Sequence, residues 1–349
     1  MRGPIGRFLE LFDGTLSGSV RLLNPPGQEL AFLPQLYYML LAAKLRRATP
    51  LWDPRMRWED YGSSANIDDR RGGGMGLPGG VGGLGIGGMI VLTLIGWALG
   101  IDPRILIGGA EMATRGGGGG YTQQEPERRT GAPPTDQQGR FASAILKSTE
   151  DVWSQVLPNQ TGRPYPPTTM VLYTGGTRSG CGSAQSAMGP FYCPLDKRVY
   201  LDVTFFREME QRFRAGGEFA YAYVIAHEVG HHLQNVLGIL PKVQQRQREV
   251  DRAGANQLSV RVELMADCLA GVWAMSSNER YKDLTQADIQ QAIAAASAIG
   301  DDRLQKQAQG HVTPDSFTHG SSEQRVRWFM TGFKSGQVKA CDTFRTARL

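Results

Sequence analysis

Apolar and polar positions divide the chain into one long uncharged segment and a longer region of mixed pattern. No charged residue occurs from Gly72 to Ile101, and the second half of this stretch is strongly apolar. The 21 residues from Val81 to Ile101 match the length of a helix that crosses a bilayer. Glycines four apart within it would also suit a close helix–helix contact, and so an oligomer. The alternative is a glycine-rich loop that leads into a buried helix.

The segments around this predicted transmembrane helix lack a helical or strand period. Residues 56–80 are polar and rich in glycine, and residues 110–139 are rich in Gly, Pro and Gln, which is typical of a flexible linker. Residues 1–55 are interpreted as an N-terminal extension that is disordered or follows a start codon assigned too early. Lys and Arg are balanced at the two ends of the apolar segment, so the positive-inside rule does not set its orientation.

The pattern from residue 140 to residue 349 predicts an α+β domain. Helical spacing covers Phe141 to Leu157, and two β-branched or aromatic runs, Thr168–Gly175 and Lys197–Phe206, predict strands. The second strand is expected at a sheet edge beside a cleft, where it could pair with an extended peptide. Thr285 and Ser321 each have the spacing of a capping box, which predicts two later helix starts.

All five histidines lie between His227 and His319, and three of them fall within "YVIAHEVGHHLQN" (Tyr223–Asn235). Its apolar spacing predicts a helix, on which His227 and His231 lie one turn apart on one face and can share a metal ion. Glu228, about 100° further round, can reach a water at that metal. This is the His-Glu-x-x-His arrangement of two zinc ligands and a general base. The alternative is a buried helix with core histidines.

A third ligand is expected downstream, because a catalytic zinc usually has three protein ligands. In the helical stretch Ser259–Met275, Glu263 and Asp267 interrupt an apolar pattern on one face. A buried carboxylate is costly unless it is paired or binds metal, which favours Glu263 as the third ligand. Asp267 would then accept the ring N–H of one zinc histidine. The alternative is a solvent-facing acidic edge paired with Arg261 or Arg252.

These residues carry a resemblance. His227-Glu228-x-x-His231 followed by Glu263-x-x-x-Asp267 resembles the gluzincin metallopeptidases, in which a glutamate on a second helix is the third ligand. More closely, the chain from residue 56 to residue 344 resembles a bacterial family of neutral zinc metallopeptidases with one N-terminal membrane span. The segments that carry this resemblance are Cys181–Phe206, the histidine helix, Val262–Trp273 and Phe317–Phe329. It implies a zincin-like domain, a small sheet with active-site helices, that binds one zinc per chain and hydrolyses peptide bonds, but it names no substrate. Our expectation for the substrate is a peptide or an unfolded protein.

The remaining histidines are assigned by context. In related peptidases a Thr-His before the last helix lies near the zinc, so the resemblance implies that His319 stabilises the oxyanion. The alternative is a loop histidine that caps the next helix. His232 faces away from the metal and is expected to be structural, and His311 has no recognisable context. In this mechanism Glu228 takes a proton from the attacking water and delivers it to the leaving amine.

The four cysteines all follow the apolar segment, and none has the Cys-x-x-Cys spacing. Cys181 and Cys193 bracket a loop that a disulfide could close, and a bridge from Cys268 to Cys341 would hold the C-terminal tail. An even count on one side of the apolar segment favours an oxidising compartment, although four reduced thiols are the alternative. With disulfides, residues 56–80 would be cytoplasmic. The domain would lie outside the cytoplasm, anchored by one span in a bacterial inner membrane.

Composition narrows the function further. The net charge of +5 is small, and the arginines are scattered rather than interleaved with aromatic residues, which argues against nucleic-acid binding. Two functions remain: a membrane-anchored zinc endopeptidase, and a catalytically vestigial, membrane-tethered scaffold or peptide-binding protein. Glu228 favours the enzyme, because a purely structural zinc site needs no general base.

Overall fold

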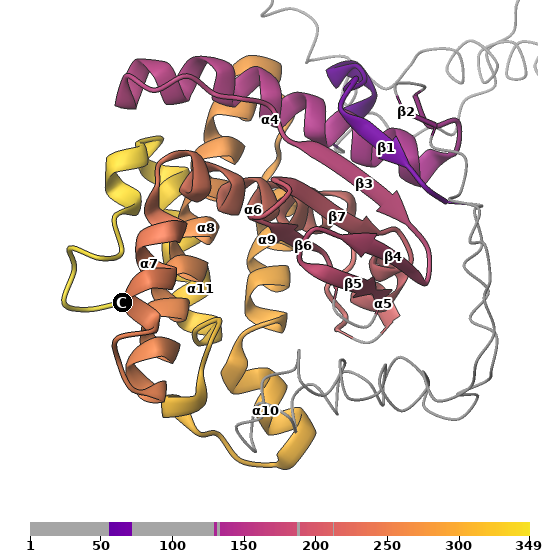
Figure 1. Ribbon diagram of the computed structural model, residues 1–349. Coiled ribbons are helices and arrows are strands. Elements are labelled where there is room, and N and C mark those ends of the chain that lie inside the picture. The colour runs from indigo at the N-terminus through magenta and orange to yellow at the C-terminus, as the bar shows by residue number, and fades with distance from the viewer. Residues whose placement is uncertain (1–55, 72–128, 131–132, 187–188, 212) are drawn as a thin grey trace, which may run out of the picture. The chain divides into compact units, whose positions relative to one another are not determined.

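Five strands form the central sheet of the region that the structure describes, in the order β2-β1-β3-β7-β6 (Figure 1). This computed structural model describes residues 56–71, 129–130, 133–186, 189–211 and 213–349. The strands are β1 (Ile67–Asp69), β2 (Arg129–Thr130), β3 (Thr169–Tyr173), β6 (Phe191–Cys193) and β7 (Arg198–Asp202). The central strands β1, β3 and β7 are parallel, and β2 and β6 run antiparallel at the two edges.

Strand β3 is buried on both faces. Met170 and Leu172 belong to the large core shared with the helices, whereas Val171 and Tyr173 belong to a smaller cluster that contains Ala184 of the β4–β5 hairpin. The hairpin consists of β4 (Gly176–Ser179) and β5 (Gly182–Gln185). The near-continuous apolar run of β3 follows from this double coverage.

Helices complete the described α+β fold. They are α4 (Gln137–Thr161), α5 (Phe205–Gln211), α6 (Glu218–Val236), α7 (Ile239–Gln247), α8 (Arg252–Tyr281), α9 (Gln286–Ala298), α10 (Asp301–Gln309) and α11 (Ser322–Ser335), with 3-10 turns η2 (Trp58–Tyr61), η4 (Pro314–Ser316) and η5 (Val338–Cys341). Both predicted capping boxes are confirmed: Thr285 with Asp288 opens α9, and Ser321 with Gln324 opens α11. Each satisfies backbone N–H groups that a helix start would leave unpaired.

Helices α8 and α11 cross with their backbones in close contact. A Cβ placed on Gly332 would lie 1.8 Å from the carbonyl oxygen of Cys268, and one on Gly271 would lie 2.0 Å from that of Phe329. Only glycine fits at these two positions. The close approach brings side chains of α11 against the polar face of α8.

Residues 56–71 belong to this fold, which corrects two predicted boundaries. Met56, Trp58 and Ile67 are buried in the main core, and β1 pairs in parallel with β3. The prediction of residues 56–80 as a separate polar segment is therefore wrong for residues 56–71. The predicted linker 110–139 also contains β2 and the start of α4. The sequence hides β1 because two of its three residues are aspartates.

The charges of β1 are balanced within the sheet. Asp68 is 1 % exposed and pairs with Arg70 at 2.7 Å and with Arg198 of β7 at 3.1 Å. Asp69 pairs with Arg71 at 2.6 Å. A buried carboxylate is tolerated when it is paired in this way.

The prediction that the second strand lies at an edge is also wrong. Both predicted strands exist, as β3 and β7, but β7 lies between β3 and β6. The edge on this side is β6, which is antiparallel to β7 and packs against α6. Apolar patterning shows which residues are buried but not which strand lies beside which, so this error could not be avoided.

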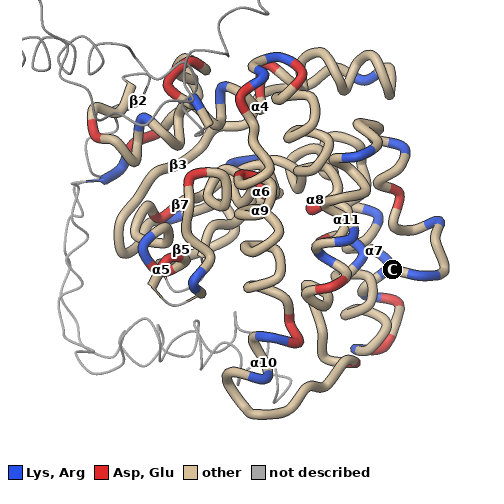
Figure 2. Tube along the Cα trace, turned by 180° about the vertical axis from the view of Figure 1, so that it is seen from behind, with Lys and Arg blue, Asp and Glu red and all other residues tan. Residues whose placement is uncertain are grey.

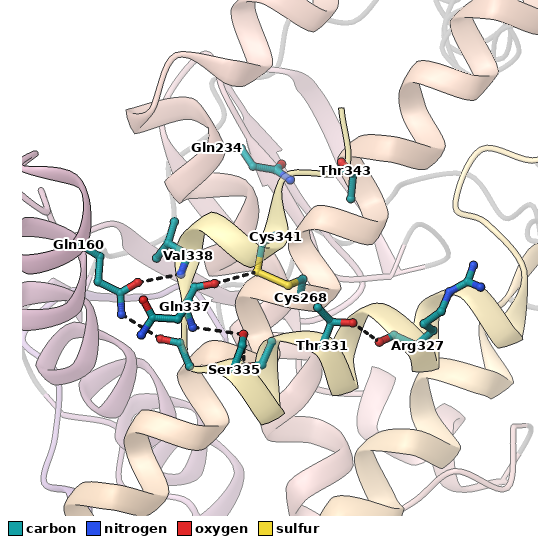
Figure 3. The surroundings of a disulfide bond; sticks show 12 residues. Gln160, Gln234, Cys268, Arg327, Thr331, Ser335, Gln337, Val338, Cys341 and Thr343 are labelled. Atoms are coloured by element: carbon teal, nitrogen blue, oxygen red, sulfur yellow. Dashed lines mark hydrogen bonds between the residues drawn. A yellow bond between two sulfur atoms is a disulfide. The ribbon is translucent and has the colours of Figure 1, made fainter. Parts of the chain in front are cut away.

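Two disulfides tie distant segments together. Cys181–Cys193 links the β4–β5 turn to β6, and Cys268–Cys341 links α8 to the C-terminal tail (Figure 3). Both pairings considered from the sequence are present. Beside the second, Gln160 of α4 donates to the carbonyl of Gly336 at 2.8 Å and accepts from the N–H of Val338 at 2.7 Å.

The predicted span Val81–Ile101 and the extension 1–55 lie outside the described residues. Within the described part of the chain, every helix is either too short or too polar to cross a membrane.

Candidate metal centre

Three predicted ligands meet where α6 and α8 pack together. One donor atom each from His227, His231 and Glu263 lies within 4.8 Å of the other two. The Nε2 atom of His227 is 3.1 Å from one Glu263 oxygen, and that of His231 is 3.5 Å from the other. Two imidazole nitrogens and a carboxylate on two helices thus converge on one point.

The second nitrogen of each imidazole is held by a different partner. Nδ1 of His227 lies 2.9 Å from Asp267 Oδ1, and Nδ1 of His231 lies 2.9 Å from Gln234 Oε1. Gln234 is itself fixed, because its amide donates to the carbonyl of Val262 at 2.6 Å. If Nδ1–H donates in both rings, each Nε2 can present a lone pair to the shared point once a metal displaces its proton.

A buried cluster on three helices supports Asp267. Arg325 of α11 donates to both Asp267 oxygens at 2.9 Å, and the Tyr223 hydroxyl of α6 donates to the same carboxylate at 2.5 Å. Asp267 and Arg325 are 0 % and 2 % exposed. Burial alone would raise the pKa of Asp267, but Arg325 and His227 lower it below its usual value. The carboxylate is therefore ionised and can orient His227.

The carboxylates of Glu263 and Asp267 make the surroundings of the two histidines negatively charged. Burial lowers the pKa of His227, but Asp267 and Glu263 outweigh it and raise that pKa to about 10. Glu263 likewise outweighs burial and raises the pKa of His231. Burial would raise the pKa of Glu263, yet the two histidines hold it well below its usual value. Such a point favours a cation, and two nitrogens with one carboxylate are a ligand set that zinc prefers in catalytic sites.

Glu228 follows His227 directly on α6 and is buried, with 7 % of its surface exposed. Burial raises the pKa of its carboxyl, against the lowering effect of His231 and His227. No hydrogen bond to another described residue engages its carboxylate. It therefore has the environment of a general base whose pKa is shifted toward neutrality.

His319 approaches from the loop before α11. Asp301, the first residue of α10, accepts from the backbone N–H groups of Thr318, His319 and Gly320 at 2.7, 2.6 and 3.0 Å, and lies 3.2 Å from His319 Nδ1. Burial lowers the pKa of His319, but Asp301 and then Glu263 raise it above its usual value.

The other two histidines lie apart from the three ligands. His232 is 2 % exposed, with Nδ1 3.2 Å from the Tyr192 hydroxyl of β6 and Nε2 2.7 Å from the carbonyl of Pro166. His311 is exposed, with Nδ1 3.1 Å from the carbonyl of Gln309. His232 thus joins α6 to the sheet side of the fold.

Sequence comparison supplies the family. The profile described as "Putative neutral zinc metallopeptidase" matches residues 56–344. The chain belongs to this family. The chain is similar to "Uncharacterized protein YpfJ" of Escherichia coli K12, with 45% identity in an alignment of 298 positions that covers 83% of this chain and 99% of that protein. It is also similar to "Uncharacterized protein Mb2605" of Mycobacterium bovis, with 42% identity in an alignment of 265 positions that covers 72% of this chain and 85% of that protein. No solved structure matches.

Membership in this zinc metallopeptidase family agrees with the ligand set and with the fold. The family match begins at residue 56, which is also the first residue that the structure describes. Four residues around the ligands were missed by sequence reasoning: Tyr223, Gln234, Asp301 and Arg325. Gln234 could have been found, because it lies three positions after His231 on the same helix face. The other three carried no local signal.

Proposed function

We propose that this chain is a zinc-dependent endopeptidase that hydrolyses peptide bonds in peptides or unfolded proteins. The observation that carries this proposal is Glu228. Its carboxylate is buried next to three convergent metal ligands, yet no hydrogen bond to a described residue gives it a structural role. A largely buried carboxylate is costly to keep, so its position beside His227 and His231 favours a chemical role.

Each residue of the site has a separate role in this proposal. His227, His231 and Glu263 would hold the zinc, which when bound lowers the pKa of water and polarises a carbonyl oxygen. Glu228 accepts the proton of the attacking water and then delivers it to the leaving amine. His319, held by Asp301 and favoured in its protonated form, donates a hydrogen bond to the developing oxyanion.

A peptide substrate would pair with the outer edge of β6. This strand replaces β7 as the edge beside the histidine helix, and Tyr192 fixes it there through His232 and Asn235, whose side-chain amide donates to the Tyr192 hydroxyl at 2.9 Å. Main-chain hydrogen bonds to such an edge bind an extended peptide without demanding a particular sequence. Unfolded chains are therefore the substrate class.

We further propose that the domain works outside the cytoplasm, at a bacterial inner membrane. All four cysteines form disulfides, which persist in oxidising compartments. The uncharged segment Val81–Ile101 supports contact with lipid, and its glycines support self-association. We infer no nucleic-acid partner, because acidic and basic positions are interspersed on the elements in view, for example on α4 and α10 (Figure 2).

The test is Glu228→Gln, assayed against unfolded casein with zinc content measured in parallel. The amide keeps the shape of the side chain but cannot accept the proton, so cleavage should fall about 10²–10⁴-fold while zinc is retained. Phenanthroline should abolish wild-type cleavage. A variant that keeps zinc and cleaves at the wild-type rate would refute this mechanism.

The competing function is a zinc-binding, membrane-tethered scaffold. Wild-type protein that retains zinc but cleaves no unfolded substrate across a broad pH range would favour it.

A further inference from the structure

Residues on both sides of the apolar segment share one sheet. Strand β1 lies before Val81–Ile101 in the sequence, and β3 and β7 lie after it. In the sheet, Ile67 is in register with Met170 and Asp69 with Leu172. The backbone N–H of Arg70 donates to the carbonyl of Leu172 at 2.8 Å, and that of Met170 donates to Asn66 at 2.9 Å.

Side chains fix the same arrangement independently of the strand pairing. The indole N–H of Trp58 donates to Glu218 of α6 at 3.0 Å, and the Ser64 hydroxyl donates to Glu150 of α4 at 2.7 Å. Residues 56–71 therefore contact helices of the candidate metal domain as well as its sheet.

Arg71, the last described residue before residues 72–128, also contacts the chain that follows them. Arg71 donates to both oxygens of Asp136, at 2.9 and 2.7 Å. Asp136 is the N-cap of α4. In addition, β2 pairs with β1, with Asp69 in register with Arg129. The two flanks of residues 72–128 thus end at one edge of the sheet.

These contacts conflict with a single membrane crossing between the flanks. One crossing places its two flanks on opposite sides of a hydrocarbon core about 30 Å thick, which hydrogen bonds of 3 Å cannot bridge. Two helical crossings need about 40 residues, and the apolar segment has 21. The pairing of β1 with β3 and a single pass through Val81–Ile101 cannot both hold in one folded molecule.

We propose that residues 56–71 and residues 133–349 lie on the same side of the membrane, so that the domain meets the bilayer from one side only. This replaces the expectation of a cytoplasmic segment before the span and a domain beyond it. Nine residues, 72–80, separate the end of the described flank from Val81 and reach at most about 30 Å. The β1 edge of the sheet is therefore the part of the domain held nearest to any lipid that the apolar segment contacts. The inference rests on the proposed membrane location and does not depend on the peptidase activity.

The test is labelling, in cells, of two variants of the full chain that each carry one added cysteine, Ala65→Cys and Gln155→Cys. Both positions are exposed, one on each side of the apolar segment. A membrane-impermeant maleimide is applied to cells with a permeabilised outer membrane, before and after lysis of the inner membrane. The wild-type chain, whose cysteines are in disulfides, is the control. Both variants should be labelled under the same condition. Labelling of one before lysis and of the other only after it would overturn the proposal.

A second measurement keeps the inference testable if a cysteine variant misfolds. Ile67 is 2 % exposed and in register with Met170, whereas Ala65 is exposed. In membrane preparations, Ile67→Asp should lower the temperature of proteolytic unfolding of residues 133–349 by about 5 °C or more, and Ala65→Asp should not. If the two flanks lie in different compartments, both variants will unfold at the wild-type temperature.

Discussion

At the residue scale, the two candidate histidine ligands differ in what holds them. His227 is oriented by an ionised carboxylate, Asp267, and His231 by a neutral amide, Gln234. A carboxylate makes its imidazole the stronger ligand, because it stabilises positive charge on the ring. The two ligands are therefore not equivalent, although their spacing in the sequence is symmetric.

The first prediction is that Asp267→Asn weakens zinc binding about 10–100-fold, the usual cost of losing a partner of a ligating histidine. Arg325 would lose its ionised partner, so folding must be measured alongside by circular dichroism. A competition titration with a chromophoric chelator measures the affinity. The matched control is Asp288→Asn, a buried carboxylate in the capping box of α9, 4 % exposed. Equal affinity losses in both variants would mean that Asp267 acts only through stability.

The second prediction concerns pH and the pair His319–Asp301. The pKa of His319 is raised in the folded protein, so its contribution to stability is complete below its unfolded value of about 6.5 and is lost as pH rises through the folded value. The pKa of Asp301 is lowered, so its contribution is lost as pH falls below about 4. Asp301→Asn should therefore destabilise most between pH 4 and 6.5, by about 1–3 kcal/mol.

Urea unfolding across this pH range measures the effect. The control is Asp302→Asn, because Asp302 accepts from the backbone and hydroxyl of Ser322 and has no histidine partner. Its destabilisation should not change between pH 6 and pH 9. A pH-independent penalty in Asp301→Asn would show that the carboxylate serves only the backbone N–H groups.

Site residues that lie close together along the chain could be predicted from the sequence, and those far apart could not. His227, Glu228 and His231 fall within two turns of one helix, and Glu263 and Asp267 within two turns of another, so helical spacing identifies them. Arg325 lies 58 residues after Asp267, and nothing in local patterning links them. Its partner becomes evident only once α8 and α11 are packed together.

At the element scale, the crossing of α8 and α11 determines whether Arg325 reaches Asp267. The third prediction is that Gly332→Ala destabilises the domain by about 1–3 kcal/mol or more, because its methyl group would overlap the Cys268 carbonyl and force the helices apart. The control is the half-buried neighbour Thr331→Ala, which should cost about 1 kcal/mol or less. Denaturant unfolding measures both, and equal costs would contradict the close crossing.

Secondary structure itself was largely predictable, and the arrangement of strands was not. Helix and strand periods identified α4, β3, β7, α6 and α8, and capping chemistry identified the starts of α9 and α11. Strand β1 escaped because it is three residues long and charged, and its burial depends on arginines of β7 and of its own flank. Strand order depends on long-range pairing, which no local period encodes.

At the scale of the whole molecule, the two disulfides close loops of different size. Cys268–Cys341 spans 73 residues and Cys181–Cys193 spans 12. The fourth prediction is that replacing Cys268 and Cys341 by serines lowers the free energy of unfolding by about 4.5 kcal/mol, because the disulfide no longer restricts the unfolded chain. Replacing Cys181 and Cys193 by serines should lower it by about 3 kcal/mol. Denaturant unfolding of the two double variants measures the difference. A larger loss from the shorter loop would show that native contacts, rather than loop entropy, dominate.

The pairing of β1 with β3 also imposes a delay on folding during synthesis. About 100 residues separate the two strands, and ribosomes add about 5–20 residues per second. Strand β1 therefore waits about 5–20 seconds for its partner to be made, with its backbone groups unpaired. During that interval the N-terminal flank is open to a chaperone or a translocation machine as an extended peptide, before the sheet that buries it has formed.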